Sequence, residues 1–171
     1  MFRDMRRKQQ LLSTEATEAV MKRCSNGVLA CIGDEGYPYA VPLSYVYHSG
    51  KIYFHSAREG HKIDAIRENP KVCFAVIDED TIVSEEYTSY FRSVIAFGKA
   101  RIAEGDEYHE AFRALVEKYS GDRPEDEKQH KIDACDRALI IAIDIEHMTG
   151  KEAIEYAIAK KARVGKRDQE G

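Results

Sequence analysis

The sequence contains no tryptophan, only four prolines, each standing alone, and no apolar run that could cross a lipid bilayer. Its longest unbroken apolar run covers residues 138–143, far short of the roughly 20 residues that a membrane-spanning helix needs. Internal repeats, low-complexity tracts and linker-like stretches are missing too. The 171 residues are 43% hydrophobic and 33% charged, so the composition predicts one soluble globular domain with its own core and excludes a disordered chain.

Disulfide frameworks and zinc ribbons are also excluded, because no C-x-x-C pair occurs. The four cysteines lie far apart, at Cys24, Cys31, Cys73 and Cys135. We expect them to be reduced and to act as small hydrophobic residues. The basic start of the chain is followed by only two leucines before polar residues resume, so a signal-peptide apolar segment is lacking. These features predict a cytoplasmic location.

The net charge of −4 is unevenly distributed. Residues 1–10 and 160–171 are basic and together carry a charge of +6, which leaves −10 on the rest of the chain. An acidic body argues against nucleic acid as the partner, but a few local donors can still hold one small anion. We expect a basic arm over residues 1–13, a single domain over 14–160 and a mobile basic tail over 161–171.

The first half of the chain predicts one helix followed by strands. Ser13 or Thr14 can cap a helix over 14–24. Three strand-like runs, at 27–33, 39–48 and 51–57, the second of them rich in Val and Tyr, are joined by short polar turns and predict an antiparallel meander. A short helix follows, and Asn69-Pro70 ends it.

The second half predicts three more strands, at 71–77, 93–103 and 138–145, with a bulge at Gly98 and an acidic loop between the first two. A helix over 106–119 has a core-facing apolar stripe, and 122–136 reads as a charged loop with a loose helical turn. Thr149 or Gly150 is expected to cap a last helix with Ile154 and Ile158 facing inward. Six strands with few helices predict a mainly β, α+β protein built on a small closed or partly closed antiparallel barrel.

Standard catalytic and metal-binding motifs are absent. The sequence has no nucleophile elbow, Walker loop, H-E-x-x-H or paired-carboxylate signature, and its six histidines have no standard metal-ligand spacing. We therefore expect no metal site, and spacing alone assigns no enzyme class and no catalytic residue.

The densest polar cluster lies between a strand end and a helix start, at residues 55–62 (HSAREGHK). Free backbone N–H groups, a hydroxyl and an ammonium at such a junction can bind a phosphate, and Ser56 and Lys62 are the best candidates. The same residues equally suit a plain helix cap with solvated side chains. Spacing alone does not decide between the two interpretations.

Two further features have both functional and structural interpretations. Pro42 within a strand pattern indicates an edge or a bulge, either of which leaves backbone groups free to face a ligand. Arg92, at the entry to the fifth strand, can bind a phosphate or carboxylate, or can pair with the acidic run at 78–86. On these residues alone, an edge strand and an internal ion pair are the simpler interpretations.

Four blocks follow one another along the chain, at residues 36–47 (GYPYAVPLSYVY), 51–57 (KIYFHSA), 60–64 (GHKID) and 90–100 (YFRSVIAFGKA). Together they resemble the pyridoxamine 5′-phosphate oxidase-related flavoproteins, in the branch of 5-nitroimidazole resistance proteins (nitroimidazole reductases). The opening residues 1–8 (MFRDMRRK) resemble that branch as well. The resemblance covers most of residues 1–119 and fades over 121–136.

The resemblance implies a six-stranded split β-barrel with flanking helices that forms a homodimer and binds FMN at the subunit interface. It implies flavin-ring contacts from Pro42, Leu43, Ser44 and Tyr45. It implies phosphate-side contacts from His55, Ser56, Ala57, His61 and Lys62. Further contacts, from the partner chain, would come from Arg92, Ser93 and Val94.

The resemblance also bears on chemistry. The chain lacks the Arg-x-x-Leu-Leu-Lys block of true pyridoxamine phosphate oxidases, so vitamin oxidation is not expected. A flavin supplies its own redox chemistry, which fits the missing acid/base motif. We expect an oxidoreductase that reduces a small, flat, electron-poor compound such as a nitroimidazole, in a pocket lined by Tyr45, His55 or the Tyr90-Phe91 pair. Two alternatives remain: a non-catalytic flavin carrier or sensor, and a split barrel that holds haem or a deazaflavin.

Overall fold

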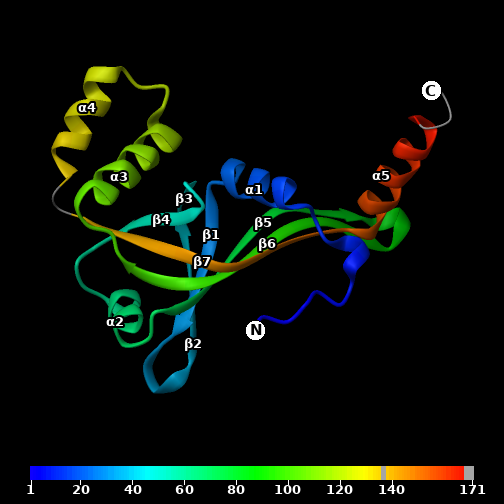
Figure 1. The fold of residues 1–171 in the computed structure, drawn as a ribbon, viewed down its shortest axis with the longest axis horizontal. Coiled ribbons are helices and arrows are strands. Elements are labelled where there is room, and N and C mark those ends of the chain that lie inside the picture. Colours follow the sequence, from blue (N-terminus) through cyan, green and yellow to red (C-terminus); the bar gives the residue numbers. More distant parts are fainter. Residues whose placement is uncertain (136–137, 168–171) are drawn as a thin grey trace.

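Seven strands form one antiparallel sheet in the order β2-β1-β5-β6-β7-β4-β3 (Figure 1). The computed structural model describes residues 1–135 and 138–167. The strands are β1 (Asn26–Ile32), β2 (Pro38–Ser44), β3 (Val46–His48), β4 (Lys51–Ser56), β5 (Lys71–Val83), β6 (Thr88–Ile102) and β7 (Leu139–Glu152). The α-helices are α1 (Thr14–Arg23), α2 (His61–Glu68), α3 (Gly105–Ser120), α4 (Glu125–Asp133) and α5 (Ile154–Arg167).

The two ends of this sheet are joined through a single residue. β2 ends at Ser44 on one edge, β3 begins at Val46 on the other, and Tyr45 alone separates them. Because consecutive Cα atoms are about 3.8 Å apart, the sheet must curl until its outermost strands meet. The sequence predicted six strands, and this number was wrong, because the run 39–48 breaks at Tyr45 into two strands with different partners.

Packing and hydrogen bonds fix the corner at Tyr45. Its side chain is fully buried against Phe74, with ring centroids 5.0 Å apart, and its hydroxyl donates to the Met21 carbonyl at 2.9 Å. The Tyr119 hydroxyl of α3 accepts from the Tyr45 N–H at 2.9 Å and bonds to the Tyr45 carbonyl at 2.7 Å. The corner is thus held from both α1 and α3.

The predicted meander is confirmed in its pairings, because β1 and β2 form one hairpin and β3 and β4 form another. Its middle run is divided at Tyr45, so β2 and β3 lie on opposite edges of the sheet. β4 pairs on its other side with β7, from Lys51 opposite Asp144 to Ser56 opposite Leu139. That pairing was not predicted, because a strand's second partner is chosen by long-range packing, whereas the hairpin signals read from sequence are local.

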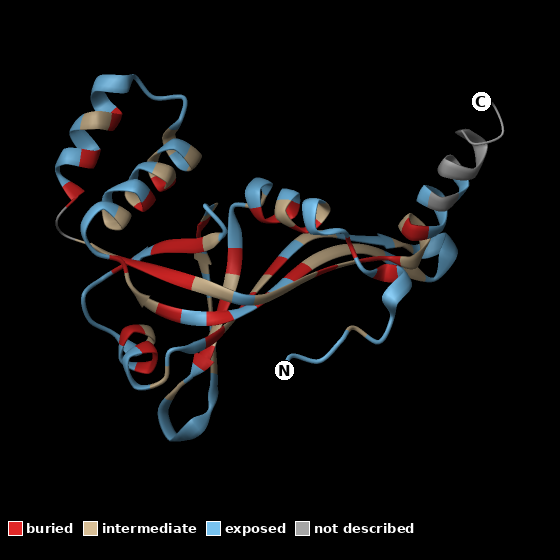
Figure 2. Ribbon diagram, in the orientation of Figure 1, coloured by how far each residue is buried: buried red, intermediate tan, exposed pale blue. Residues whose placement is uncertain are grey.

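The core lies inside the curled sheet, under α1. Side chains alternate between the two faces of each strand, and Figure 2 shows the resulting alternation of buried and exposed residues. Val72, Phe74 and Val76 of β5 point inward, and Val20 and Met21 of α1 are fully buried. The predicted cap is confirmed, since the Ser13 hydroxyl accepts from the Ala16 N–H at 3.2 Å.

The acidic run at 78–86 is not the expected loop, because β5 continues to Val83 and forms a long hairpin with β6. Cross-strand pairing through Val83 opposite Thr88 keeps Asp78, Glu79 and Asp80 in the sheet, whereas Glu85 and Glu86 lie in the short turn Ser84–Glu86 between the two strands. The bulge at Gly98 is confirmed by a register shift between Phe97 and Gly98. A side chain there would meet the Asp144 carbonyl oxygen at 2.3 Å, so the position requires glycine.

The C-terminal part differs from the prediction in three respects. Residues 125–133 form the helix α4, which ion pairs of Arg123 with Glu127 (2.7 Å) and Lys128 with Glu117 (2.8 Å) stabilise. Pairing with β6 extends β7 through Thr149 and Gly150, the two residues expected to cap the last helix. Ile158 is 60% exposed and does not face inward.

α5 continues past residue 160 to Arg167, while residues 168–171 of the expected tail lie outside the described residues.

The remaining sequence expectations concern cysteines and membranes. All four cysteines are free thiols; Cys31 and Cys135 are buried, and Cys24 and Cys73 are half-buried. Burial raises the pKa of Cys31 and of Cys73, which fits unreactive thiols. Among the described helices, none is long and apolar enough to span a bilayer.

The ion pairs of Glu107 make the free energy of unfolding depend on pH. It accepts from Arg101 at 2.6 and 2.9 Å and from Lys51 at 2.7 Å, and these bonds lower its pKa from 4.5 to about 2. A lowered folded-state pKa adds stability that is fully present above pH 4.5 and is lost as the pH falls toward 2. We expect Glu107→Gln to lower the free energy of unfolding at pH 7 but to match the wild type near pH 2.

Urea unfolding at a series of pH values would measure this convergence. Glu110→Gln, an exposed change on the same helix, is the control and should leave the free energy of unfolding nearly unchanged throughout. A Glu107→Gln curve parallel to that of the wild type at all pH values would contradict the prediction.

Candidate functional site

The structure places two of the sequence-predicted blocks side by side along the opening of the barrel. Ser44 at the end of β2 and His55 of β4 line the same cavity. Farther along, the rings of Tyr39 and His61 stack with centroids 4.1 Å apart, and His61 Nε2 lies 3.6 Å from the Asp34 carboxylate. β2 and the segment from β4 to α2 therefore border one opening, which we call the split.

β2 presents a free edge to the split, as its proline predicted. Within the described residues, β2 pairs with β1 alone, so the backbone groups on its other side face no strand. Pro42 and Ser44 are exposed, whereas Leu43 is half-buried and packs against the core. The flavin-ring contacts that the resemblance implies for β2 would thus come from its backbone and from Pro42 and Ser44.

Ser56 carries a buried polar group that suits a ligand. It is 3% exposed at the end of β4, and its hydroxyl has no hydrogen-bond partner among the described residues. Gln10 is the one other residue of the described chain with a buried side-chain oxygen or nitrogen that lacks a partner. Burying a hydroxyl without a partner is costly, by about 1–3 kcal/mol. A bound polar group would remove that cost.

The start of α2, which follows Ser56 after a four-residue link, suits an anion. Gly60 has a φ of 125° and caps α2 without a side-chain bond, while its carbonyl accepts from the Ile63 and Asp64 N–H groups. The first N–H groups of a helix and its dipole favour negative charge. Lys62 in this first turn is half-buried, and no ion pair or hydrogen bond joins it to the described part of the chain.

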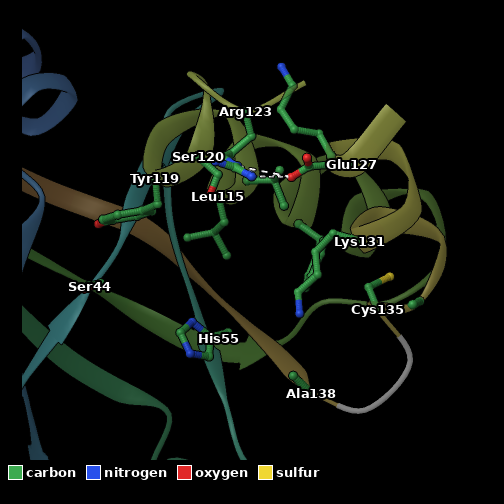
Figure 3. A pocket seen from close by; sticks show the side chains of 14 residues that line it. Ser44, His55, Leu115, Tyr119, Ser120, Arg123, Glu127, Lys131, Cys135 and Ala138 are labelled. Carbon is green, nitrogen blue, oxygen red and sulfur yellow. Dashed lines mark hydrogen bonds and ion pairs between the residues drawn. The ribbon is translucent and has the colours of Figure 1, made fainter. Parts of the chain in front are cut away.

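The other residues predicted for the phosphate side lie at the same junction but differ in orientation. The His61 ring is turned toward Tyr39 and Asp34. Of this residue, the main-chain N–H is therefore the group that remains to bind an anion at the start of α2. Ala57 is exposed in the link between β4 and α2. His55 is exposed and points into the cavity beside the split (Figure 3).

Tyr45 does not present its ring to the split or to a pocket. The ring is 0% exposed, and burial raises the pKa of its hydroxyl, which therefore stays a hydrogen-bond donor to Met21. The expectation that the Tyr45 side chain lines a substrate pocket was wrong, because the barrel closes at this residue and draws its ring inside.

Arg92, Ser93 and Val94 lie on β6, in the interior of the strand order, and not beside the split of their own chain. Arg92 pairs with Asp78 at 3.1 Å and with Glu79 at 3.3 Å, which is the internal pairing that the sequence left open. Val94 is fully buried in the core. Ser93 lies opposite Ile77 on the outer face of the sheet.

The outer face of β1, β5 and β6 is apolar. Its members are cross-strand neighbours on the side away from the core: Val28, Ala30, Ile32, Cys73, Ala75, Ile77, Ile95 and Phe97. Ile77 is 69% exposed and Ile95 42% exposed. Phe2 of the N-terminal arm stacks on Phe97 at 5.4 Å. We call this surface the outer sheet face.

One wall of the site was not predicted from the sequence. A cavity of about 700 Å³ opens between α3, α4 and the strand residues Ser44 and His55 (Figure 3). On the helical side its lining is Phe112, Leu115, Val116, Tyr119 and Ser120 of α3, Arg123 of the loop, and Glu127, Lys128 and Lys131 of α4. Leu115 is buried, as the core-facing stripe predicts, but it also lines the cavity together with Phe112 and Val116. The stretch 122–136, predicted as a charged loop with a loose helical turn, contains α4.

Comparison with known proteins identifies the family. The family model for pyridoxamine 5′-phosphate oxidase matches residues 13–152, which is most of the chain. The protein belongs to this family. An uncharacterized protein of Rhizobium meliloti (strain 1021) is 27% identical over 156 residues, which are 84% of this chain and 95% of the relative.

Solved structures share the fold. A candidate 5-nitroimidazole antibiotic resistance protein of Bacteroides thetaiotaomicron superposes with a TM-score of 0.70 at 23% identity, covering 83% of this chain and 86% of that chain. An FAD-binding protein of Mesorhizobium loti superposes with a TM-score of 0.57 at 25% identity, covering 84% and 97%. The seven-stranded antiparallel sheet with flanking helices is therefore the fold of this family.

Proposed function

We propose that this protein is an FMN-binding homodimer that acts as an oxidoreductase on small electron-poor compounds, 5-nitroimidazoles among them. The single observation that carries the proposal is the buried hydroxyl of Ser56, which has no partner among the described residues. Lys62, in the first turn of the helix that follows, has no partner there either and adds a cation. Family membership and the flavin ligand of the Mesorhizobium loti protein support a flavin as the bound group.

The residues of the split fit the parts of FMN. Ser56, the first N–H groups of α2 and Lys62 offer a hydroxyl, main-chain donors and a cation to a terminal phosphate. The free edge of β2 offers backbone groups to the polar rim of a flat ring. FMN, when bound, supplies the electron-transfer chemistry. The chain's task is to hold the ring with one face open to a substrate beside His55.

The outer sheet face is the surface that we propose as the dimer interface. Monomeric soluble proteins rarely leave a large contiguous apolar patch in water, and this one spans three strands. A second copy packed on this face would bury Ser93, which lies on it, at the subunit interface. The partner-chain contacts proposed for Arg92 and Val94 have less support, because the first is paired internally and the second is buried.

An absorption spectrum of the purified protein, before and after adding FMN, FAD, riboflavin or haem, tests the cofactor. We expect flavin bands and tightest binding for FMN, because the donors at α2 match one terminal phosphate. Equal affinity for riboflavin would remove the phosphate role, and a haem band in the purified protein would overturn the flavin assignment.

Catalysis needs a separate measurement, since a carrier or sensor would bind FMN as well. We expect the reduced flavoprotein to be reoxidised anaerobically by a nitroimidazole or a quinone faster than free reduced FMN is. A protein that binds FMN but gives no such acceleration would be a binding protein and not an oxidoreductase.

Lys62→Ala is expected to weaken FMN binding by about 1–3 kcal/mol, the scale of a lost charge-assisted hydrogen bond, which is roughly 5- to 150-fold in the dissociation constant. Flavin fluorescence quenching would measure it. Lys71→Ala removes an exposed lysine beyond the far end of α2 and is the matched control. Riboflavin affinity should not respond to either change, and an unchanged FMN dissociation constant in Lys62→Ala would discard the role.

A further inference from the structure

The cavity between α3, α4 and β4 combines an apolar wall with a cationic one. Phe112, Leu115 and Val116 of α3 form the apolar side. Lysines and an arginine from α4 and the loop before it line the opposite side. The volume of about 700 Å³ lies within the range of small-molecule sites, roughly 300–1,000 Å³.

Ion pairing leaves one of these cations available. Arg123 is bound by Glu127 at 2.7 Å, and Lys128 by Glu117 at 2.8 Å and Glu125 at 2.9 Å. Lys131 has no ion pair or hydrogen bond with any residue that the structure describes. Figure 3 shows its side chain extending from α4 into the cavity, toward the side where His55 lies.

The cavity adjoins the split and is separate from the phosphate side. Ser44 and His55 line it, whereas Ser56 and Lys62 do not. Side chains alternate along a strand, so His55 and Ser56 face opposite sides of β4: His55 is exposed toward the cavity and Ser56 is buried. A molecule in the cavity would therefore lie against His55, beside the cofactor and not in its place.

We infer that this cavity binds the substrate, and that among small electron-poor compounds it favours those with an apolar or aromatic body and one acidic group, which Lys131 pairs with while α3 covers the apolar body. The inference rests on the proposed function, because it treats the neighbouring split as the cofactor site. It assigns a role to α4, where the family resemblance fades. An ammonium facing an apolar wall selects for charge as well as shape.

Two fluorescent probes that differ in charge test the inference without catalysis. 8-Anilinonaphthalene-1-sulfonate is aromatic and anionic, and N-phenyl-1-naphthylamine has the same rings without the sulfonate. With FMN added to saturation, the anionic probe should bind the wild type more tightly. Lys131→Gln should weaken the anionic probe about tenfold and leave the neutral probe unchanged. Lys131→Arg should restore most of the loss.

Ala134→Trp, at an exposed position of the cavity lining, should block both probes. Lys71→Gln, which removes a lysine far along the chain from the cavity, should affect neither.

Equal binding of the anionic probe to wild type and Lys131→Gln would overturn the inference, as would probe binding that Ala134→Trp leaves intact. If Lys131→Gln weakened FMN itself by a similar factor, the cavity would hold the cofactor, and the inference would fail while the proposed flavin function stood. Failure of the wild type to bind FMN would instead reject the proposed function.

Discussion

Replacing Ile95 by aspartate is expected to separate the dimer into monomers and to reduce FMN affinity with it. Ile95 lies at the centre of the outer sheet face, between Ala75 of β5 and Thr149 of β7. A carboxylate buried there among the apolar side chains of a dimer interface is strongly disfavoured, because an uncompensated buried charge costs several kcal/mol. Since each 1.4 kcal/mol is tenfold, the dimer dissociation constant should rise by 100-fold or more.

The fold itself should survive this change, because the Ile95 side chain points away from the core and is 42% exposed. Sedimentation velocity would measure the oligomeric state, and flavin fluorescence the FMN dissociation constant. Ile82→Asp makes the same substitution at an 80% exposed site near the tip of the β5–β6 hairpin and serves as the control. A wild-type monomer that binds FMN tightly would contradict the dimer proposal directly.

Replacing Arg92 by alanine is expected to lower the free energy of unfolding by about 3 kcal/mol, at the low end for a broken buried ion pair. Arg92 joins β5, β6 and β7 by contacting Asp78, Glu79 and Glu152, two of which have side chains less than a tenth exposed. Burial alone would raise the pKa of Asp78, but bonds from Arg23 and Arg92 lower it to about 2. The loss is limited because Arg23 and Lys160 continue to pair with Asp78 and Glu152.

Chemical denaturation would measure this loss, and FMN titration below the unfolding transition would test the alternative role. Arg67→Ala, which removes an exposed i,i+3 pair with Asp64, should change stability by less than about 0.5 kcal/mol. A weaker FMN affinity with unchanged stability in Arg92→Ala would show that this arginine serves the cofactor and not the sheet.

Local features of the fold could be predicted because their causes lie within a few residues. The Ser13 cap, the end of α2 at Asn69 and the bulge at Gly98 depend on single side chains or on their absence. α4 was missed because its residues have no apolar stripe; ion pairs with Glu117 and within the helix stabilise it instead. Those partners become neighbours only after α3 and α4 pack together.

The candidate site also contains residues that the sequence could predict and residues that it could not. The cluster at 55–62 could be found from sequence, because a strand end followed by a helix start is a local pattern with a known affinity for anions. Sequence could not place Tyr45, since its spacing suits a strand equally well facing a ligand or facing the core. Arg92 had two possible partners, and only the pairing of β5 with β6 determined which one it has.

The scarcity of prolines and the alternating apolar strands by themselves determined a β-rich fold, because burial and periodicity follow from composition and order. The four sequence blocks also determined the family. Only the tertiary structure decided that Tyr45 closes the sheet, that Ser56 is buried without a partner, and that Lys131 enters a cavity beside His55. Each of these depends on contacts between segments far apart in the chain, whose geometry no local pattern encodes.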